Sequence, residues 1–117
     1  MIKVKICGIT NLEDAVSSIE AGTDALGFVF YKKSPRYITP EEARQVIKEL
    51  PAHIIKIGVF ANAKEKVIRR IAKFCSLDIL QFHGNESAEF CRRFGGYKII
   101  KVIRIKDRID LKNMLKY

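Results

Sequence analysis

Two short segments of this sequence, one ending at Cys7 and one containing Gln81 and His83, have side chains suited to chemistry on a small substrate. Cys7 follows a short alternating stretch, residues 2–7, and precedes Gly8 and the predicted start of a helix. Near lysines and the positive end of a helix, such a thiol would ionise and then accept a proton or attack an electrophile. A buried cysteine that only fills the core is the open alternative. Gln81 and His83 stand two residues apart, so in a strand both would point into one pocket.

The basic loop at residues 31–37 is a third candidate, because it carries Lys32, Lys33 and Arg36 between two tyrosines. It is longer than most connections between a strand and a helix. An arginine offers a bidentate fork for a carboxylate or phosphate, and tyrosines could flank an aromatic substrate. We expect Arg36, next to Pro35, to make the specific contact. A lysine-rich loop that is simply solvated remains the alternative.

The remaining histidine and cysteines have plainer interpretations. For His83 itself, the roles of proton donor, orienting group and hydrogen-bonded lining residue are open, and lining is favoured. His53 is expected at the opposite ends of the strands, with a structural role. Cys75 and Cys91 fall within helical patterns and are expected to pack in the core. Three cysteines without metal-ligand spacing favour a reducing compartment and predict neither a disulfide framework nor a metal site.

Alternating strands and helices must position these residues. Apolar stretches predict five strands, at residues 2–7, 24–30, 54–60, 77–82 and 97–105. Helical spacing predicts five helices, which begin at capping boxes of Thr10 with Glu13 and Thr39 with Glu42, at Asn62, near residue 87 and near residue 109. Five βα units imply a parallel sheet with right-handed crossovers. No linker divides residues 1–117, so we expect a single domain.

Two α/β architectures accommodate five βα units: a partial TIM (βα)8 barrel, or an open, flavodoxin-like sheet. Length favours the open sheet, because a complete barrel needs about 200 residues. Side-chain parity favours the barrel. Lys5 and Cys7 share one strand face, as do Gln81 and His83, whereas a doubly wound sheet is apolar on both faces. Polar inward positions fit the mouth of a barrel, where barrel enzymes hold their active sites. Lys101 is a further candidate for this inward set.

Composition and charge narrow the classes of function. With 48% hydrophobic and 30% charged residues, the chain is typical of a globular domain. The apolar runs are too short for a membrane span, and no signal peptide is predicted, so we expect a soluble cytoplasmic protein. A net charge of +9 would attract phosphates, nucleic acids or other anions. The basic residues form neither a long run nor an RNA-binding or zinc-finger pattern, which disfavours nucleic acid as a partner.

Five motifs in order resemble the phosphoribosylanthranilate isomerase family: KICGIT at residues 5–10, GFVF at 27–30, SPRY at 34–37, GVF at 58–60 and QFHG at 81–84. The resemblance implies a TIM barrel and an aldose–ketose isomerase of tryptophan biosynthesis. Such an enzyme converts N-(5-phosphoribosyl)anthranilate to 1-(2-carboxyphenylamino)-1-deoxyribulose 5-phosphate without cofactor or metal. By the same resemblance, Cys7 is the catalytic base, Arg36 contacts the anthranilate, and Gln81 and His83 position the substrate.

The length of 117 residues departs from the family pattern. In the family, the segment beyond the fifth strand carries the general-acid aspartate and the loops that bind the substrate phosphate. Asp107 and Asp110 follow the predicted fifth strand, which is the wrong segment for that acid. We therefore expect little activity unless a complementary C-terminal part is supplied. The alternative is a non-catalytic half-barrel that self-associates through exposed strand edges.

Overall fold

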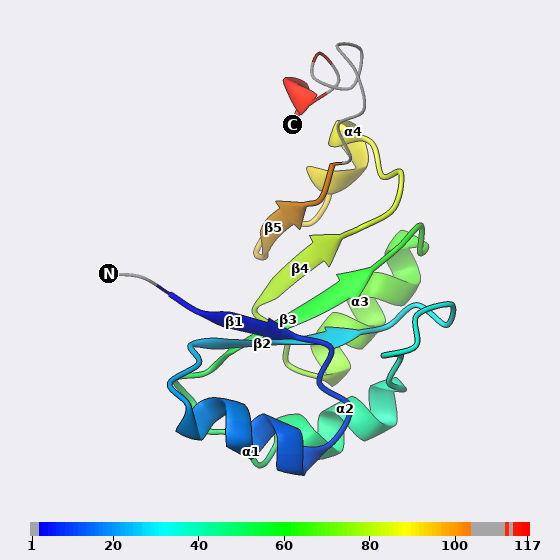
Figure 1. Cartoon of the computed structure of the whole chain (residues 1–117). Helices are drawn as coiled ribbons and strands as arrows, with labels where there is room; N and C mark the ends of the chain where they lie inside the picture. Colours follow the sequence, from blue (N-terminus) through cyan, green and yellow to red (C-terminus); the bar gives the residue numbers. More distant parts are fainter. Residues whose placement is uncertain (1–2, 104–111, 113) are drawn as a thin grey trace.

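The strands lie side by side in the order in which they occur in the sequence (Figure 1). The computed structural model describes residues 3–103, 112 and 114–117. In this part of the chain a parallel sheet contains five strands: β1 (Lys5–Cys7), β2 (Ala25–Val29), β3 (Ile55–Phe60), β4 (Ile79–Phe82) and β5 (Lys98–Lys101). A flavodoxin-like sheet would place β1 between β2 and β3. The observed order excludes that alternative and confirms the five-unit part of a barrel, with β1 and β5 as the open edges of the described sheet.

Helices connect the strands and lie on one side of the sheet (Figure 1). Within the described residues they are α1 (Leu12–Glu20), α2 (Pro40–Ile47), α3 (Glu65–Phe74) and α4 (Ala88–Cys91). No helix among them is long and apolar enough to cross a membrane. The predicted fifth helix, and with it Asp107 and Asp110, falls largely on residues 104–111 and 113, which lie outside the described residues.

The start of α2 follows directly from its sequence. The Thr39 hydroxyl accepts a hydrogen bond from the Glu42 N–H at 3.2 Å, and the Glu42 carboxylate accepts one from the Thr39 N–H at 3.1 Å. This confirms the predicted capping box, with Pro40 in the first turn. The Thr39 hydroxyl also donates to the Glu42 carboxylate at 2.8 Å. The bonds that this carboxylate accepts from the Thr39 N–H and hydroxyl favour its ionised form and lower the pKa of Glu42.

Two other predicted helix starts are wrong. The side chain of Asn11, not Thr10, caps α1, because its amide oxygen accepts the Asp14 N–H at 2.8 Å. Helix α3 begins at Glu65 rather than Asn62. Asn62 cannot start a helix because its φ of 55° lies in the left-handed region.

The strand side chains separate into two layers, as period-2 alternation requires. The layer facing the helices is apolar and almost completely buried, and its strand members are Leu26, Phe28, Phe60, Leu80 and Phe82. The opposite layer contains Cys7 paired with Gly27, and Gln81 paired with Val59. The chemical candidates on β1 and β4 therefore share the face that lacks helices.

That inward face is curved. The Lys5 ammonium donates a hydrogen bond to the Gln81 side-chain oxygen, although β2 and β3 separate their strands. In a flat sheet β1 and β4 would lie about 14 Å apart, and side chains standing perpendicular to it would not meet. The bond between Lys5 and Gln81 thus requires the sheet to curl into a barrel wall.

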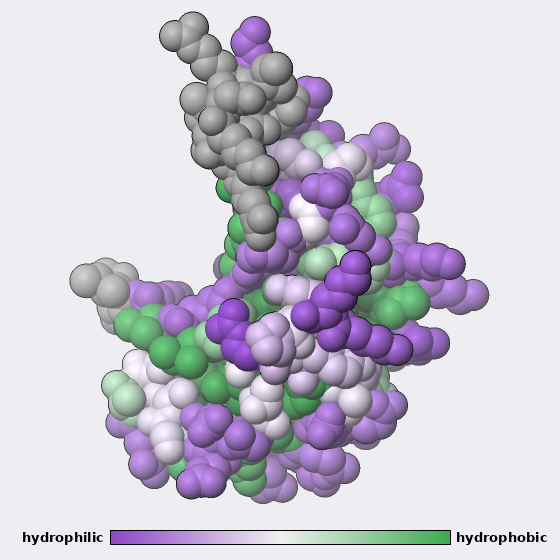
Figure 2. Space-filling model, turned by 45° about the vertical axis from the view of Figure 1, so that its right-hand side comes forward, coloured by the Kyte–Doolittle hydropathy of each residue, from purple (hydrophilic) through white to green (hydrophobic). Residues whose placement is uncertain are grey.

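Apolar side chains remain exposed beside the β1 edge. Val4 and Ile6 are 46% and 39% exposed, and Leu12 and Val16 of the adjacent α1 are 39% and 43% exposed. Figure 2 shows apolar surface next to the N-terminal strand. Within the described sheet, this edge consequently presents both unpaired backbone and hydrocarbon to its surroundings.

Candidate active site

Cys7 and Arg36 lie close together at the C-terminal end of β1. Gly8 has a φ of 91°, a conformation that glycine adopts readily. A Cβ atom added to Gly8 would overlap Cδ of Arg36, so the arginine side chain packs directly on this residue. The structure therefore brings the predicted base and the predicted anion contact to adjacent positions, although they are far apart in the sequence.

The three cysteines differ in how far they are buried. Cys7 is partly exposed, and Cys75 and Cys91 are buried in the core cluster as predicted. A Cβ atom on Gly27 would lie 3.0 Å from Cys7 Sγ, so the glycine opposite Cys7 leaves room for the thiol. Burial raises the pKa of Cys75 to about 11 and also raises that of Cys91, which keeps both protonated at neutral pH. Among the three cysteines, Cys7 alone is partly exposed.

Hydrogen bonds hold the loop between β2 and α2, both in its middle and where its ends meet. The Ser34 hydroxyl accepts the Arg36 N–H at 3.1 Å, and the Ile38 N–H donates to the Val29 carbonyl at 2.9 Å. Residues Lys32 and Lys33 are exposed, as is Arg36. The two lysines match the solvated interpretation, whereas Arg36 packs on Gly8, the residue after Cys7.

The same loop also contacts the end of β4. The rings of Tyr31 and His83 stack with centroids 6.3 Å apart and planes 23° apart. The His83 N–H donates to the Phe60 carbonyl at 2.8 Å, which fixes its backbone against β3. The sequence pattern gave a tyrosine and a histidine without indicating that they would meet. One loop therefore reaches both the residue after Cys7 and His83.

Gln81 lies deeper than His83. It is 8% exposed, and its oxygen accepts the hydrogen bond from Lys5 across the inward face. Its amide nitrogen is left as the donor that could meet a substrate. His53 is exposed and precedes β3, at the opposite ends of the strands, as predicted.

The placement of Lys101 in the inward set is wrong. Register pairs Lys101 with Phe82, whose ring belongs to the helix-facing core, while Ile100 takes the inward position opposite Gln81. The Lys101 ammonium instead binds Glu86 at 2.9 Å.

The sequence did not indicate that Glu86 and Asn62 support the candidate site, since neither belongs to a periodic pattern. In the described part of the chain, no group of three or more His, Cys, Asp or Glu could hold a metal ion.

The strand order, the curled sheet and the polar residues at the strands' C-terminal ends define a βα-barrel protein, in which chemistry is placed at this end. A model of the N-(5'phosphoribosyl)anthranilate (PRA) isomerase family matches residues 4–117. The chain belongs to the N-(5'-phosphoribosyl)anthranilate isomerase family.

Relatives and solved structures agree with this assignment. Proteins named N-(5'-phosphoribosyl)anthranilate isomerase from Pelobacter propionicus and Geotalea uraniireducens are 51% and 52% identical over the whole chain. The crystal structure of phosphoribosyl anthranilate isomerase from Thermotoga maritima superimposes with a TM-score of 0.93 at 46% identity, covering 100% of this chain and 58% of that one. A structure of the isomerase in complex with reduced 1-(o-carboxyphenylamino)-1-deoxyribulose 5-phosphate gives a TM-score of 0.94 at 46% identity, covering 100% and 61%.

This chain spans only part of the length of its relatives. It covers 56% of the Pelobacter protein and 57% of the Geotalea protein. The shared part contains every residue of the candidate site described above.

Proposed function

We propose that this chain supplies the N-terminal part of a phosphoribosylanthranilate isomerase active site, for the Amadori rearrangement in tryptophan biosynthesis. The observation that carries the proposal is that the loop between β2 and α2 contacts the chain at two places, beside Cys7 after β1 and at His83 after β4. Arg36 packs on Gly8 beside Cys7, and Tyr31 of the same loop stacks on His83. The free cysteines and a biosynthetic role support a cytoplasmic location.

The proposed reaction moves protons and one C–O bond, so it needs no redox cofactor. A general acid protonates the ribose ring oxygen, the bond from C1 to that oxygen breaks, and an iminium forms between C1 and the anthranilate nitrogen. Cys7, as thiolate, removes the C2 proton. The C2–H electron pair forms a C1=C2 bond while the iminium π electrons return to nitrogen, which gives an enolamine. Loss of the C2 hydroxyl proton and protonation of C1 then give the ketone.

The other candidate residues would bind and orient the substrate. Arg36 offers two parallel N–H donors to the anthranilate carboxylate. The stacked pair of Tyr31 and His83 provides an aromatic wall for the benzene ring. Gln81, whose oxygen is occupied by Lys5, would donate through its amide nitrogen to the sugar.

Full activity in this proposal requires the strands that close the sheet between β1 and β5. The described residues include no assigned general acid and no assigned phosphate site. A general acid contributes about 10²–10⁴-fold to the rate, so these residues alone would turn over little substrate.

A complementation assay tests the proposal. The chain is mixed with the C-terminal segment of the Thermotoga maritima relative that it does not match, and substrate and product are separated by chromatography. Turnover should appear only in the mixture and should disappear with Cys7→Ala, whereas Cys75→Ala, at a buried thiol, serves as the matched control. Equal turnover of the Cys7→Ala and Cys75→Ala mixtures contradicts the role of Cys7.

The open edges favour a second candidate, a non-catalytic half-barrel that self-associates. β1 and β5 are both unpaired on one side in the described sheet, and Val4 and Ile6 are exposed beside β1. Such edges pair readily with other chains. Light scattering distinguishes this candidate, since a monomer at high concentration contradicts edge pairing.

A further inference from the structure

A buried carboxylate, Glu86, links β5 to the loops after β3 and β4. Its side chain is 3% exposed and accepts two hydrogen bonds, one from the Lys101 ammonium at 2.9 Å and one from the Asn62 N–H at 2.8 Å. Burial alone would raise the pKa of Glu86, but the bonds from Lys101 and Asn62 outweigh it and hold the pKa below its usual value. Glu86 is therefore ionised at neutral pH and uses both oxygens.

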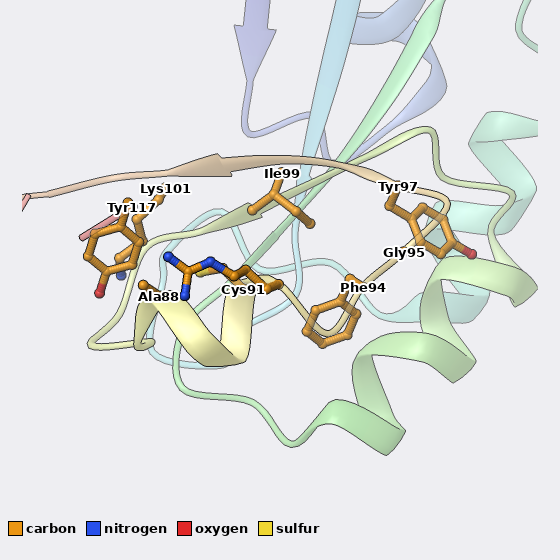
Figure 3. Close-up of a pocket in the computed structure, with 9 residues that line it drawn as sticks. Ala88, Cys91, Phe94, Gly95, Tyr97, Ile99, Lys101 and Tyr117 are labelled. Atoms are coloured by element: carbon orange, nitrogen blue, oxygen red, sulfur yellow. The ribbon is translucent and has the colours of Figure 1, made fainter. Parts of the chain in front are cut away.

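The ion pair is shielded from solvent. Lys101 is only 9% exposed at its side chain. Its ammonium lies 5.8 Å from the centre of the Tyr117 ring, and the Tyr117 hydroxyl donates to the Glu86 carbonyl. Figure 3 shows Lys101 and Tyr117 next to each other at one end of the hollow between α4 and β5. A charge held there depends on its partner rather than on water.

The same residues hold the turn that directly follows His83. Lys101 also donates to the Gly84 carbonyl, and the Asn62 side-chain oxygen accepts the Asn85 N–H at 2.7 Å. A Cβ atom on Gly84 would lie 2.7 Å from Asn62 Cγ, so the two loops pack at a distance that only glycine permits. The backbone after His83 is thus attached to two other segments of the chain.

We propose that Glu86, with Asn62 and Lys101, positions the His83 ring in the candidate active site. The His83 N–H is bonded to the Phe60 carbonyl, so the backbone is fixed before the network begins. With the next residues fixed as well, the imidazole is directed onto Tyr31. This inference rests on the proposed function for the role of His83, but the positioning itself is a geometric claim.

An isosteric change can break the network without opening a cavity. Glu86→Gln has one acceptor oxygen, and its NH2 group must face either the Lys101 ammonium or the Asn62 N–H, donor against donor. Asn62→Gly tolerates the φ of 55° and retains the N–H, and removes only the acceptor for Asn85.

Proton NMR of the full chain reports on His83 directly, because the sequence contains only two histidines. We expect nuclear Overhauser contacts between the His83 and Tyr31 rings in the wild type. Glu86→Gln and Asn62→Gly should lose them and shift the His83 ring signals, whereas the signals of the distant His53 stay in place.

Asp78→Asn is the matched control. Asp78 accepts the Lys56 N–H at 2.8 Å and pairs with the Lys56 ammonium at 3.5 Å, at the opposite ends of the strands. This control should leave the His83 signals unchanged. The proposal is overturned if Asn62→Gly, or a folded Glu86→Gln, keeps the ring contacts of the wild type. The NMR readout is independent of turnover. If the isomerase assay fails but Glu86→Gln and Asn62→Gly still lose the ring contacts, the proposed function is refuted and the positioning role of Glu86 stands.

Discussion

Replacing Lys101 with methionine should produce a large and pH-dependent loss of stability. The change leaves the Glu86 carboxylate 3% exposed without its cationic partner. Breaking a buried pair by removing one partner costs about 3–5 kcal/mol. Because a domain of this size has a free energy of unfolding of about 5–15 kcal/mol, the variant should be severely destabilised at pH 7.

The sign of the pH dependence follows from the lowered pKa of Glu86. In the wild type, a carboxyl whose folded-state pKa is depressed contributes stability above its unfolded pKa of about 4.3, and loses it as the pH falls through the folded-state pKa. In Lys101→Met the penalty comes from the unpaired charge, and protonation removes that charge. The difference in stability between wild type and variant should therefore shrink from pH 7 to pH 4.

Urea unfolding at the two pH values, followed by circular dichroism, measures this difference. Glu86→Gln combined with Lys101→Met is the matched control, because it carries no buried charge. We expect the double variant to recover most of the lost stability and to lose the excess pH dependence. A loss that is equal at pH 7 and pH 4, or equal in the single and double variants, refutes the account of Glu86 as a buried ionised group.

Three further predictions concern the candidate site. In the complemented protein, Cys7→Ala should lower kcat by about 10²–10⁴-fold, with KM nearly unchanged, in steady-state kinetics. Arg36→Ala should chiefly raise KM, and an unchanged KM would mean that Arg36 is solvated surface. Gly8→Ala should cost at least about 1 kcal/mol in urea unfolding, because of its positive φ and the overlap with Arg36. Wild-type stability of this variant would show that the arginine does not pack there.

Local sequence patterns predicted which strands and helices are present, but they predicted the residues at which the helices begin less well. The apolar alternation of all five strands was sufficient to find them, and the Thr39 capping box was sufficient to begin α2. Asn62 was misread because the same side chain that can cap a helix can also bond to a distant loop. That competing bond is formed with the segment after β4, which no local pattern contains.

The second feature that the sequence predicted incompletely is the face of the sheet on which each strand residue lies. Counting by twos along β1 and β4 correctly placed Cys7 and Gln81 on the inward face. On β5 the register depends on which residue of β4 faces Lys98, and this pairing is a tertiary fact. Lys101 therefore went to the wrong face, and its partner Glu86 could not be recognised. The candidate residues at the C-terminal ends of β1 and β4 were easier to find from the sequence than the residues that support them.

The geometry of this half-site arises within the described strands and loops. Gly8 meets Arg36 of the next βα unit, and Tyr31 meets His83 two units further along the chain. Glu86 in turn joins the third, fourth and fifth units through Asn62 and Lys101. None of these contacts needs a strand beyond β5. Under the proposed function, complementing strands would therefore add the general acid and the phosphate site to a half-site in which Cys7 and the stacked pair of Tyr31 and His83 are already in place.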